Sequence, residues 1–316
     1  MKNVVITDYS FNDLSIEEEI FQESKIKLTS EKSPNKEALK VLTQNADYII
    51  TQFAKLDNEI INNLNKAKII VRYGVGYDNV DIKAARSKNI PVCNVPDYCI
   101  DEVADHTIAF ILNTTRAIYK NHHKVFQGEW GLAVPMEEMK SLNDLKIGVI
   151  GFGRIGQAVV ERLIPFKPKI LINDPFISNP VNKDGLSFVE INELFKNSDI
   201  ITLHCPSTEK TKNIINDHSL SLMKKGVSII NIGRGDLIDM GSFINALKNQ
   251  TINSAALDVF DTEPLPENHP IRFFDNVLFS SHVASVSVKA AKKLRQSAAE
   301  LVIKCHNNEN LINIVN

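Results

Sequence analysis

Residues 146–156 read KIGVIGFGRIG, an apolar run that passes directly into three glycines with the spacing GxGxxG. Such glycine-rich sextets also occur in ordinary turns, so the spacing alone is a weak signal. The surroundings make it specific, because the apolar run is typical of a buried strand and the helix-like stretch Gln157–Leu163 follows it. A second strand-like run, Ile170–Asn173, then ends at Asp174. This order predicts an open parallel α/β sheet with a ligand at its carboxyl edge.

The three glycines and Asp174 each meet a different demand of a bound dinucleotide. Gly151 permits the tight turn, Gly153 lets a pyrophosphate approach the backbone, and Gly156 lets the helix pack closely against the strand. N–H groups without partners at the start of the helix would hold the phosphates. Asp174 lies eighteen residues after Gly156, where it would bind the ribose hydroxyls and repel a 2′-phosphate. The pattern therefore predicts NAD as the cofactor rather than NADP.

Length and composition narrow the class of protein. With 316 residues the chain exceeds the size at which a single core stops growing, which favours two domains. The net charge of −2 gives no reason to expect nucleic acid or a membrane surface as a partner, and no apolar run reaches the roughly 20 residues that cross a bilayer. Residues 1–8 read as a first strand rather than a secretory signal. The four cysteines lack metal-binding spacing, so we expect reduced thiols in a cytoplasmic protein without a metal site.

Short strand-like runs alternate with helical stretches, which is typical of parallel sheets with crossover helices. We predict an α/β protein with two doubly wound parallel-sheet domains, in residues 1–98 and 99–287. A long helix from Ile100 to about Gln127 would link them, and residues 288–316 would form a helix that returns to the first domain. The strand candidates are 4–7, 26–28, 48–51, 69–72 and 91–94, then 146–150, 170–173, 200–204, 228–232, 255–257 and 277–279.

Three polar side chains, Arg234, Glu263 and His282, follow the last three of these strand candidates. Each has an ordinary alternative on its own, because an arginine at a turn, a glutamate before a proline and a histidine closing an apolar run are often structural or solvated. Since the carboxyl ends of parallel strands meet at one edge of a sheet, we expect these three side chains to gather beside the dinucleotide.

Together the three side chains have a use in reducing a ketone with NADH. His282, as an imidazolium, would protonate the carbonyl oxygen, while Glu263 bonds the other ring nitrogen and orients the ring. Arg234 would hold a carboxylate or carbonyl oxygen and stabilise the developing negative charge. We expect packing or solvated roles for the other histidines considered, namely His106, His122, His123 and His204.

Several motifs in the same order resemble the D-isomer-specific 2-hydroxyacid dehydrogenase family, over essentially the whole chain. The resemblance implies Arg234, Glu263 and His282 as the catalytic trio, and a Rossmann NAD-binding domain inserted in a flavodoxin-like substrate domain. It also implies a homodimer formed through the cofactor domains. The stretches that carry it are 72–81 (RYGVGYDNVD), 151–156 (GFGRIG), 231–235 (NIGRG), 257–264 (LDVFDTEP) and 281–285 (SHVAS).

The resemblance also assigns binding residues. Backbone N–H groups of Val75 and Gly76 are implied to bind the substrate carboxylate, with Arg72 and Arg234 as further substrate contacts. The implied cofactor contacts are Val75, Thr107, Gly151, Gly153, Arg154, Ile155, Gly156, Asp174, Cys205, Pro206, Ile232, Gly233, Arg234, Asp258, His282 and Ser285.

Two departures from branches of the family bear on the substrate. The branch of the C-terminal-binding corepressors carries a Trp three residues after the histidine, where this chain has Ser285. Phosphoglycerate dehydrogenases tend to carry basic residues after the third strand, whereas residues 51–54 read TQFA here. We therefore expect a small unphosphorylated 2-oxo acid, such as glyoxylate or hydroxypyruvate. The alternatives are a D-3-phosphoglycerate dehydrogenase, which would rely on Arg72 or Lys55, and an NADH-sensing regulator of the corepressor kind.

Overall fold

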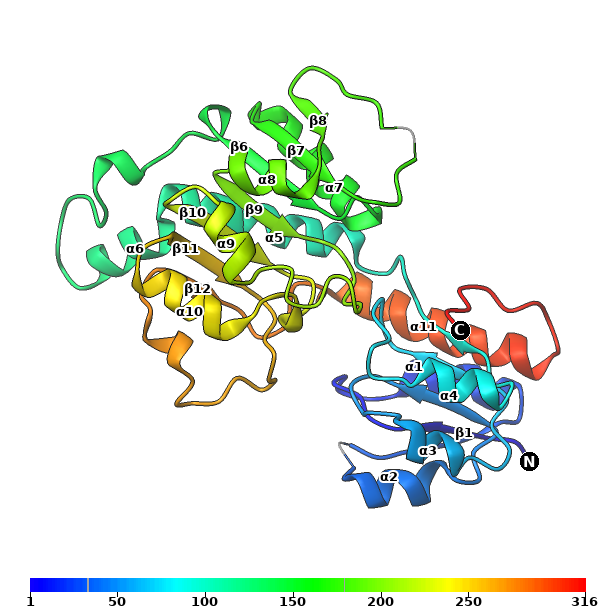
Figure 1. Ribbon diagram of the computed structural model, residues 1–316. Coiled ribbons are helices and arrows are strands. Elements are labelled where there is room, and N and C mark those ends of the chain that lie inside the picture. The colour runs from blue at the N-terminus through cyan, green and yellow to red at the C-terminus, as the bar shows by residue number, and fades with distance from the viewer. Residues whose placement is uncertain (33, 179) are drawn as a thin grey trace. The chain divides into compact units, whose positions relative to one another are not determined.

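Two parallel β-sheets organise the chain, one in each of two units (Figure 1). The computed structural model describes residues 1–32, 34–178 and 180–316. Unit 1 comprises Met1–Cys99 and Val286–Asn316, and unit 2 comprises Ile100–Ser285. Every strand pair in both sheets is parallel, with helices between successive strands, so the predicted α/β class with two parallel sheets is confirmed.

Unit 1 contains a five-stranded sheet with the order β2-β1-β3-β4-β5, which is the flavodoxin-like order. Each strand predicted in this part of the chain lies within two residues of an observed strand. The strands are β1 (Asn3–Ile6), β2 (Lys27–Ser30), β3 (Tyr48–Thr51), β4 (Ile70–Arg72) and β5 (Val92–Cys93). The helices are α1 (Ser15–Glu23), α2 (Lys36–Thr43), α3 (Asn58–Asn62), α4 (Ile82–Ser87) and α11 (Val288–His306).

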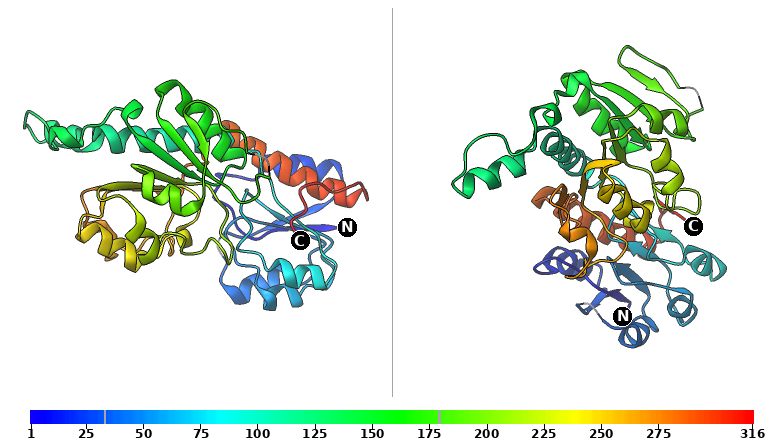
Figure 2. Two further views of the ribbon diagram at one scale, coloured as in Figure 1. Left: turned by 45° about the horizontal axis from the view of Figure 1, so that its top comes forward. Right: turned by 60° about the vertical axis from the view of Figure 1, so that its left-hand side comes forward.

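Side chains that alternate along β1 supply apolar groups to both faces of this sheet. Val4 and Ile6 belong to a cluster that includes residues of α1 and α11, whereas Val5 belongs to a second cluster with residues of α2, α3 and α4. All three side chains are fully buried. Figure 2 shows α11 lying beside α1. Unit 1 is therefore a three-layer structure with the sheet in the middle.

A buried ion pair holds α11 to α1. Arg295 Nη2 lies 2.7 Å from Glu17 Oε2, and Arg295 Nε lies 3.0 Å from both carboxylate oxygens. The Tyr73 hydroxyl donates to Glu17 Oε1 at 2.8 Å, and burial beside this carboxylate raises the pKa of Tyr73 well above 10.0. Glu17 is 0% exposed. Its carboxylate is stable in the core because the Arg295 guanidinium and the Tyr73 hydroxyl donate hydrogen bonds to it. The last helix of the chain is thereby part of unit 1.

Unit 2 contains a seven-stranded sheet with the order β12-β11-β10-β9-β6-β7-β8. The strand order reverses between β6 and β9, which is the switch point of a Rossmann fold and the place where such sheets bind ligands. The strands are β6 (Lys146–Ile150), β7 (Lys169–Asn173), β8 (Leu186–Phe188), β9 (Ile200–Leu203), β10 (Val227–Asn231), β11 (Ile252–Leu257) and β12 (Val277–Phe279). The α-helices are α5 (Ile100–Arg116), α6 (Ile118–Phe126), α7 (Arg154–Leu163), α8 (Ile191–Asn197), α9 (Asp217–Leu222) and α10 (Met240–Lys248), and the 3-10 helices are η1 (Met136–Glu138), η2 (Leu142–Asp144), η3 (Ile164–Phe166), η4 (Gly235–Leu237) and η5 (Pro270–Phe273).

The prediction of one helix over residues 100–127 is wrong, because this stretch forms two helices, α5 and α6. Ala117 separates them with a φ of 47°, in the left-handed region that ends a helix. The Asn113 side chain then accepts a hydrogen bond from the Tyr119 N–H at 2.8 Å. This side chain satisfies a donor that the first turn of a helix otherwise leaves unpaired, so the break is stabilised locally.

Strand β8 was not predicted from the sequence. It pairs with β7 at the edge of the sheet, and its three residues are only partly buried. A short edge strand of this kind needs no continuous apolar run, so it leaves a weak pattern.

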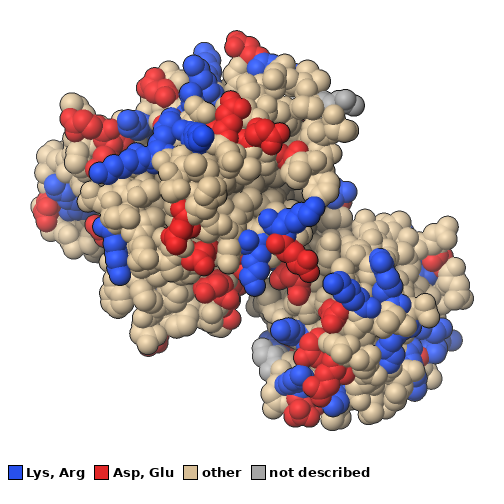
Figure 3. Space-filling view, viewed as in Figure 1, with Lys and Arg blue, Asp and Glu red and all other residues tan. Residues whose placement is uncertain are grey.

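Charged side chains of both signs are intermixed on the face seen in Figure 3. Among the residues that the structure describes, no helix combines the length and apolar character needed to cross a membrane. Within the same residues, no group of three or more His, Cys, Asp or Glu side chains is arranged to hold a metal ion.

Replacing Glu17 tests the buried ion pair. We expect Glu17→Gln to lower the free energy of unfolding by up to about 3–5 kcal/mol, because the substitution removes the buried carboxylate and leaves Arg295 paired only with Asp13, at 3.2 Å. Urea denaturation at neutral pH measures this change. Glu18→Gln is the matched control, since Glu18 is exposed on the same helix and its loss should change stability little. Equal losses in the two variants would contradict a special role for the buried pair.

Candidate active site

The glycine loop after β6 is shaped by close backbone packing. Gly151 has a φ of 94°, and a Cβ there would lie 2.6 Å from the Cys205 backbone nitrogen. A Cβ on Gly156 would lie 2.1 Å from the Gly151 carbonyl oxygen. Around Gly153, by contrast, no atom lies within 4 Å of the added Cβ. The first and third glycines are therefore required by packing, while the second leaves open space at the start of α7.

That open space has the chemistry of a phosphate site. Gly153 is the N-cap residue of α7 and offers no side-chain cap, so backbone N–H groups at the helix start face the space in front of Gly153. Asp174, at the end of β7, accepts the Phe152 N–H at 2.7 Å and the Phe176 N–H at 2.9 Å. Its carboxylate is thereby tied to the glycine loop. The residues present fit a dinucleotide, with phosphates at α7 and a ribose at Asp174.

Arg234 lies on a loop after β10 that is built around Asn231. The buried Asn231 side chain donates to the Arg234 carbonyl at 2.8 Å and accepts the Gly233 N–H at 3.0 Å. A Cβ on Gly235 would lie only 1.9 Å from the Phe260 carbonyl carbon, so this loop packs directly on the chain after β11. The backbone of Arg234 is therefore held in place from both sides.

Glu263 and His282 form the central contact of the candidate site. His282 Nδ1 lies 2.7 Å from Glu263 Oε2, and the Phe260 N–H donates to Glu263 Oε1 at 2.9 Å. Partial burial would raise the pKa of Glu263, but the hydrogen bonds from His282 and Phe260 and the charges of His282 and Arg234 lower it below its usual 4.5. Glu263 is therefore ionised at neutral pH and can both orient the imidazole ring and stabilise a positive charge on it.

The loop that carries His282 is clamped by the buried side chain of Asp258, at the end of β11. One carboxylate oxygen accepts hydrogen bonds from the Ser280 hydroxyl and the Val283 N–H, and the other accepts the Ala284 N–H. The His282 N–H itself donates to the Asp258 carbonyl at 2.8 Å. His282 has a φ of 57°, a region that a residue other than glycine occupies only when its surroundings hold it there.

The other residues predicted for the site divide between the two units. Thr107, Arg154, Ile155, Cys205, Pro206, Ile232 and Ser285 belong to unit 2, and Arg72, Val75 and Gly76 belong to unit 1. The Thr107 hydroxyl donates to the Val103 carbonyl on its own helix at 2.7 Å. In unit 1, the Asn94 side chain donates to the Val75 carbonyl at 2.6 Å and so anchors the loop of Val75 and Gly76.

Two of the histidines for which we expected packing or solvated roles, His204 and His106, have different surroundings in the structure. His204 hydrogen-bonds Thr202 at 2.9 Å, and burial lowers the pKa of His204 to about 3, so a packed role stands. His106 Nε2 lies 3.1 Å from Ser280 Oγ, next to the His282 loop. The sequence carried no signal for this contact, because His106 and Ser280 are separated by 174 residues.

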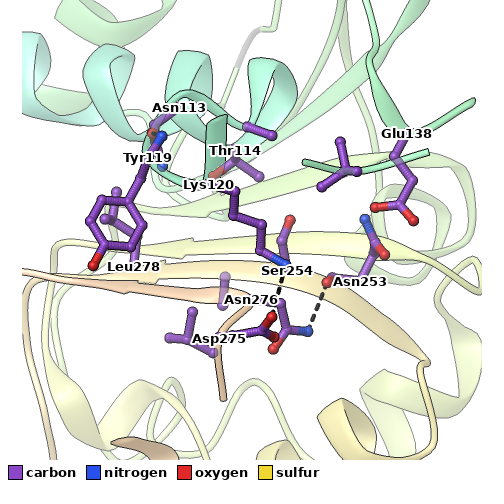
Figure 4. Close-up of a pocket in the computed structure, with 14 residues that line it drawn as sticks. Asn113, Thr114, Tyr119, Lys120, Glu138, Asn253, Ser254, Asp275, Asn276 and Leu278 are labelled. Atoms are coloured by element: carbon purple, nitrogen blue, oxygen red, sulfur yellow. Dashed lines mark hydrogen bonds and ion pairs between the residues drawn. The ribbon is translucent and has the colours of Figure 1, made fainter. Parts of the chain in front are cut away.

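A shallow pocket lies at the opposite edge of the same sheet (Figure 4). Asn253 and Asn276 lie at or just before the starts of β11 and β12, and the Asn276 side chain donates to the Asn253 carbonyl at 2.8 Å. Lys120 of α6 lies 3.5 Å from Asp275. Because parallel sheets bind their ligands at the carboxyl ends of the strands, this pocket is separate from the candidate active site.

The Rossmann strand order, the glycine loop and the Glu263–His282 pair at the same edge define a dinucleotide-dependent oxidoreductase. Residues 108–284 match the family of the D-isomer specific 2-hydroxyacid dehydrogenases, in its NAD binding domain. The chain belongs to this family and uses NAD, as the sequence predicted.

Relatives and solved structures agree with this assignment. A D-3-phosphoglycerate dehydrogenase of Methanocaldococcus jannaschii is 38% identical over 286 residues, which are 89% of this chain but only 54% of that protein, so the chain spans about half the length of this relative. A glyoxylate reductase of Thermofilum pendens is 36% identical over 79% of this chain and 75% of its own. The NAD-dependent formate dehydrogenase of Staphylococcus aureus, solved with NAD, has a TM-score of 0.90 and 27% identity over 100% of this chain and 99% of its own.

The lowered pKa of Glu263 predicts how stability varies with pH. Because the pKa is lower in the folded protein than the ordinary 4.5, the ionised side chain contributes stability that is complete above 4.5 and is lost as the pH falls through the folded-state value. Wild type should therefore be more stable than Glu263→Gln at neutral pH, and the difference should disappear in acid. Urea denaturation at several pH values measures it. Glu267→Gln, at an exposed position of the same loop, should show no such trend; a difference for Glu263→Gln that persists in acid contradicts the assignment.

Proposed function

We propose that the chain reduces a small 2-oxo acid to the D-2-hydroxy acid with NADH, and that His282, Glu263 and Arg234 perform the chemistry. The observation that carries this proposal is the 2.7 Å contact between His282 Nδ1 and Glu263, in the same unit as the dinucleotide loop. A histidine held by an ionised carboxylate at the carboxyl edge of this sheet is suited to proton transfer rather than to packing.

In this proposal each side chain has one task. Bound NADH supplies a hydride to the carbonyl carbon. His282 gives a proton from Nε2 to the carbonyl oxygen, and Glu263 keeps the ring in place. Arg234 holds the carbonyl or carboxylate oxygen and stabilises the negative charge that develops on it. In the opposite direction His282 takes the hydroxyl proton.

We assign the parts of the chain accordingly. Residues 1–98 with the helix in 288–316 form the substrate domain, and residues 99–287 form the NAD-binding domain. In the substrate domain the N–H groups of Val75 and Gly76 bind the substrate carboxylate, supported by the Asn94 side chain that anchors this loop. For the NAD-binding domain, we propose the same cofactor contacts that the resemblance to the family implies.

The loop after β3 favours a substrate without a phosphate. Residues 51–54 carry no charge, and Phe53 is 54% exposed there. Of the two cations on which a phosphorylated substrate would rely, Arg72 is only 8% exposed, whereas Lys55 is exposed. The T. pendens relative is named a glyoxylate reductase, which supports glyoxylate or a similar acid. A phosphoglycerate dehydrogenase activity is the second candidate, supported by the M. jannaschii relative.

A substrate panel and one substitution test this function. NADH oxidation with glyoxylate, hydroxypyruvate, pyruvate, phenylpyruvate and 3-phosphohydroxypyruvate should show turnover, fastest with a small unphosphorylated acid. His282→Ala should lower kcat/KM by roughly 10²–10⁴-fold, because the proton donor is lost, and should change NADH affinity far less than it changes turnover. His218→Ala, at an exposed position of α9, is the control and should behave as wild type. Tight NADH binding without turnover of any acid would instead favour an NADH-sensing regulator.

We also propose a cytoplasmic location. Cys93 and Cys205 are buried thiols, and burial raises the pKa of Cys93 to about 12 and that of Cys205 to about 11. Such thiols stay protonated and unreactive, as suits a reducing compartment.

We further propose that two copies form a homodimer through α6 and the segment after it. None of the residues of α6 is buried, although several are apolar. Exposed apolar side chains that gather in one segment suit an interaction site, and most oligomers of identical chains are symmetric dimers. The exposed apolar residues are Ile118, Tyr119, Val125, Phe126, Trp130, Leu132 and Met136, with exposed fractions from 50% to 89%.

Sedimentation equilibrium tests the homodimer. The wild-type protein should sediment at twice the chain mass of 35.4 kDa. The double variant Phe126→Ser/Trp130→Ser should sediment as a monomer, because it removes the two most exposed aromatic groups of this surface. Phe176→Ser, which removes an 88% exposed phenylalanine elsewhere in unit 2, is the matched control and should stay dimeric. A wild-type monomer, or a dimer unaffected by the double variant, contradicts the proposal.

A further inference from the structure

A second histidine, His106 of α5, reaches the loop of His282. His106 Nε2 lies 3.1 Å from the Ser280 hydroxyl oxygen. Its ring packs edge-on against Phe110, one turn further along α5, with ring centroids 4.4 Å apart. The ring is half-buried. It is thus held in one orientation by packing on one side and by a hydrogen bond on the other.

The direction of the hydrogen bonds follows from the chemistry of the groups. The Ser280 hydroxyl has one hydrogen, and it donates that hydrogen to Asp258 Oδ1. A carboxylate that also receives the N–H groups of Val283 and Ala284 acts only as an acceptor. Ser280 must therefore accept from His106, so His106 carries a hydrogen on Nε2. The result is a chain of donors that runs from His106 through Ser280 to Asp258.

This series of hydrogen bonds ends at Asp258, the side chain that holds the His282 loop in place. Asp258 binds the loop on both sides of His282, through Ser280 before it and through Val283 and Ala284 after it. His282 stands at a φ of 57°, so its backbone needs such support to keep that conformation. Without the donor from His106, the Ser280 hydroxyl would keep only its bond to Asp258 and would be held there less firmly. Asp258 would then hold the segment before His282 less firmly.

We propose that His106 is a positioning residue for the reaction: by fixing the Ser280 hydroxyl on Asp258, it holds the loop that presents His282 to the substrate. The inference rests on the proposed role of His282 as proton donor. His106 itself transfers no proton to the substrate. Its partners Phe110 and Ser280, and Asp258 to which Ser280 donates, lie in unit 2 together with His282.

Two pairs of variants test the proposal. His106→Phe keeps a ring to pack on Phe110 but removes the donor, whereas His106→Gln keeps a donor. Ser280→Ala removes the hydroxyl, whereas Ser280→Thr keeps it. We expect His106→Phe and Ser280→Ala each to lower kcat about 10- to 100-fold, since a displaced His282 reacts poorly even when substrate is bound. KM for the 2-oxo acid and the affinity for NADH should change little, and the Gln and Thr variants should recover most of the activity.

The double variant separates a shared role from two independent ones. If His106 acts through Ser280, His106→Phe/Ser280→Ala should be no slower than the slower single variant. Fully additive losses would overturn the proposal. So would a His106→Phe variant that keeps wild-type kcat and only melts at a lower temperature, because that result describes a packing role alone.

An observation independent of turnover distinguishes failure of this inference from failure of the proposed function. In protein labelled with ¹⁵N-histidine and saturated with NADH, the imidazole signals of His282, assigned with His282→Ala, should shift or broaden in His106→Phe and stay near wild type in His106→Gln. An unchanged His282 signal in His106→Phe overturns the positioning role. A wild-type protein that reduces none of the acids overturns the proposed function alone, and the imidazole signals then decide whether His106 holds the loop.

Discussion

Contacts between backbone segments at three glycines set the carboxyl edge of unit 2, where the candidate site lies. A Cβ on Gly151, Gly156 or Gly235 would come within 2.6 Å, 2.1 Å and 1.9 Å, respectively, of a main-chain atom. Main-chain atoms cannot give way as a flexible side chain can, so these positions exclude any larger residue. The contacts join the loop after β6 to that after β9, and the loop after β10 to that after β11. They therefore fix the backbone next to Arg234 and Glu263 of the candidate site.

Two carboxylates show how the same chemistry serves different purposes in the two units. Glu17 is 0% exposed, faces a guanidinium that cannot lose its proton, and ties α11 to α1. Glu263 has a 33% exposed side chain and faces a histidine, the residue type whose proton is easily gained or lost near neutral pH. The Glu17–Arg295 pair has a structural role in the core of unit 1. The second pair is partly exposed to solvent and forms the central contact of the candidate site.

Local sequence patterns explain why the strands and the glycine loop could be predicted from the sequence. The strands of both sheets are short apolar runs, and the glycine spacing became specific because an apolar run precedes it and a helix-like stretch follows it. Features that depend on a single backbone angle or on partners elsewhere were missed. The break at Ala117 depends on a left-handed backbone angle and on the side chain of Asn113. Strand β8 is defined by its pairing with β7. Neither leaves a periodic signal in the chain.

The sequence by itself determined the class of the fold, the dinucleotide loop and the identity of the three polar side chains at the strand ends. These follow from residue type and from short-range spacing, because turns, strands and phosphate-binding glycines are local structures. Only the tertiary structure gave the contacts that no motif announces. It places His282 Nδ1 beside Glu263, a pairing that the sequence already led us to expect, and it joins His106 to Ser280 across 174 residues, which the sequence did not. Hydrogen bonds over such separations depend on the order of strands in the sheet, which no local pattern encodes.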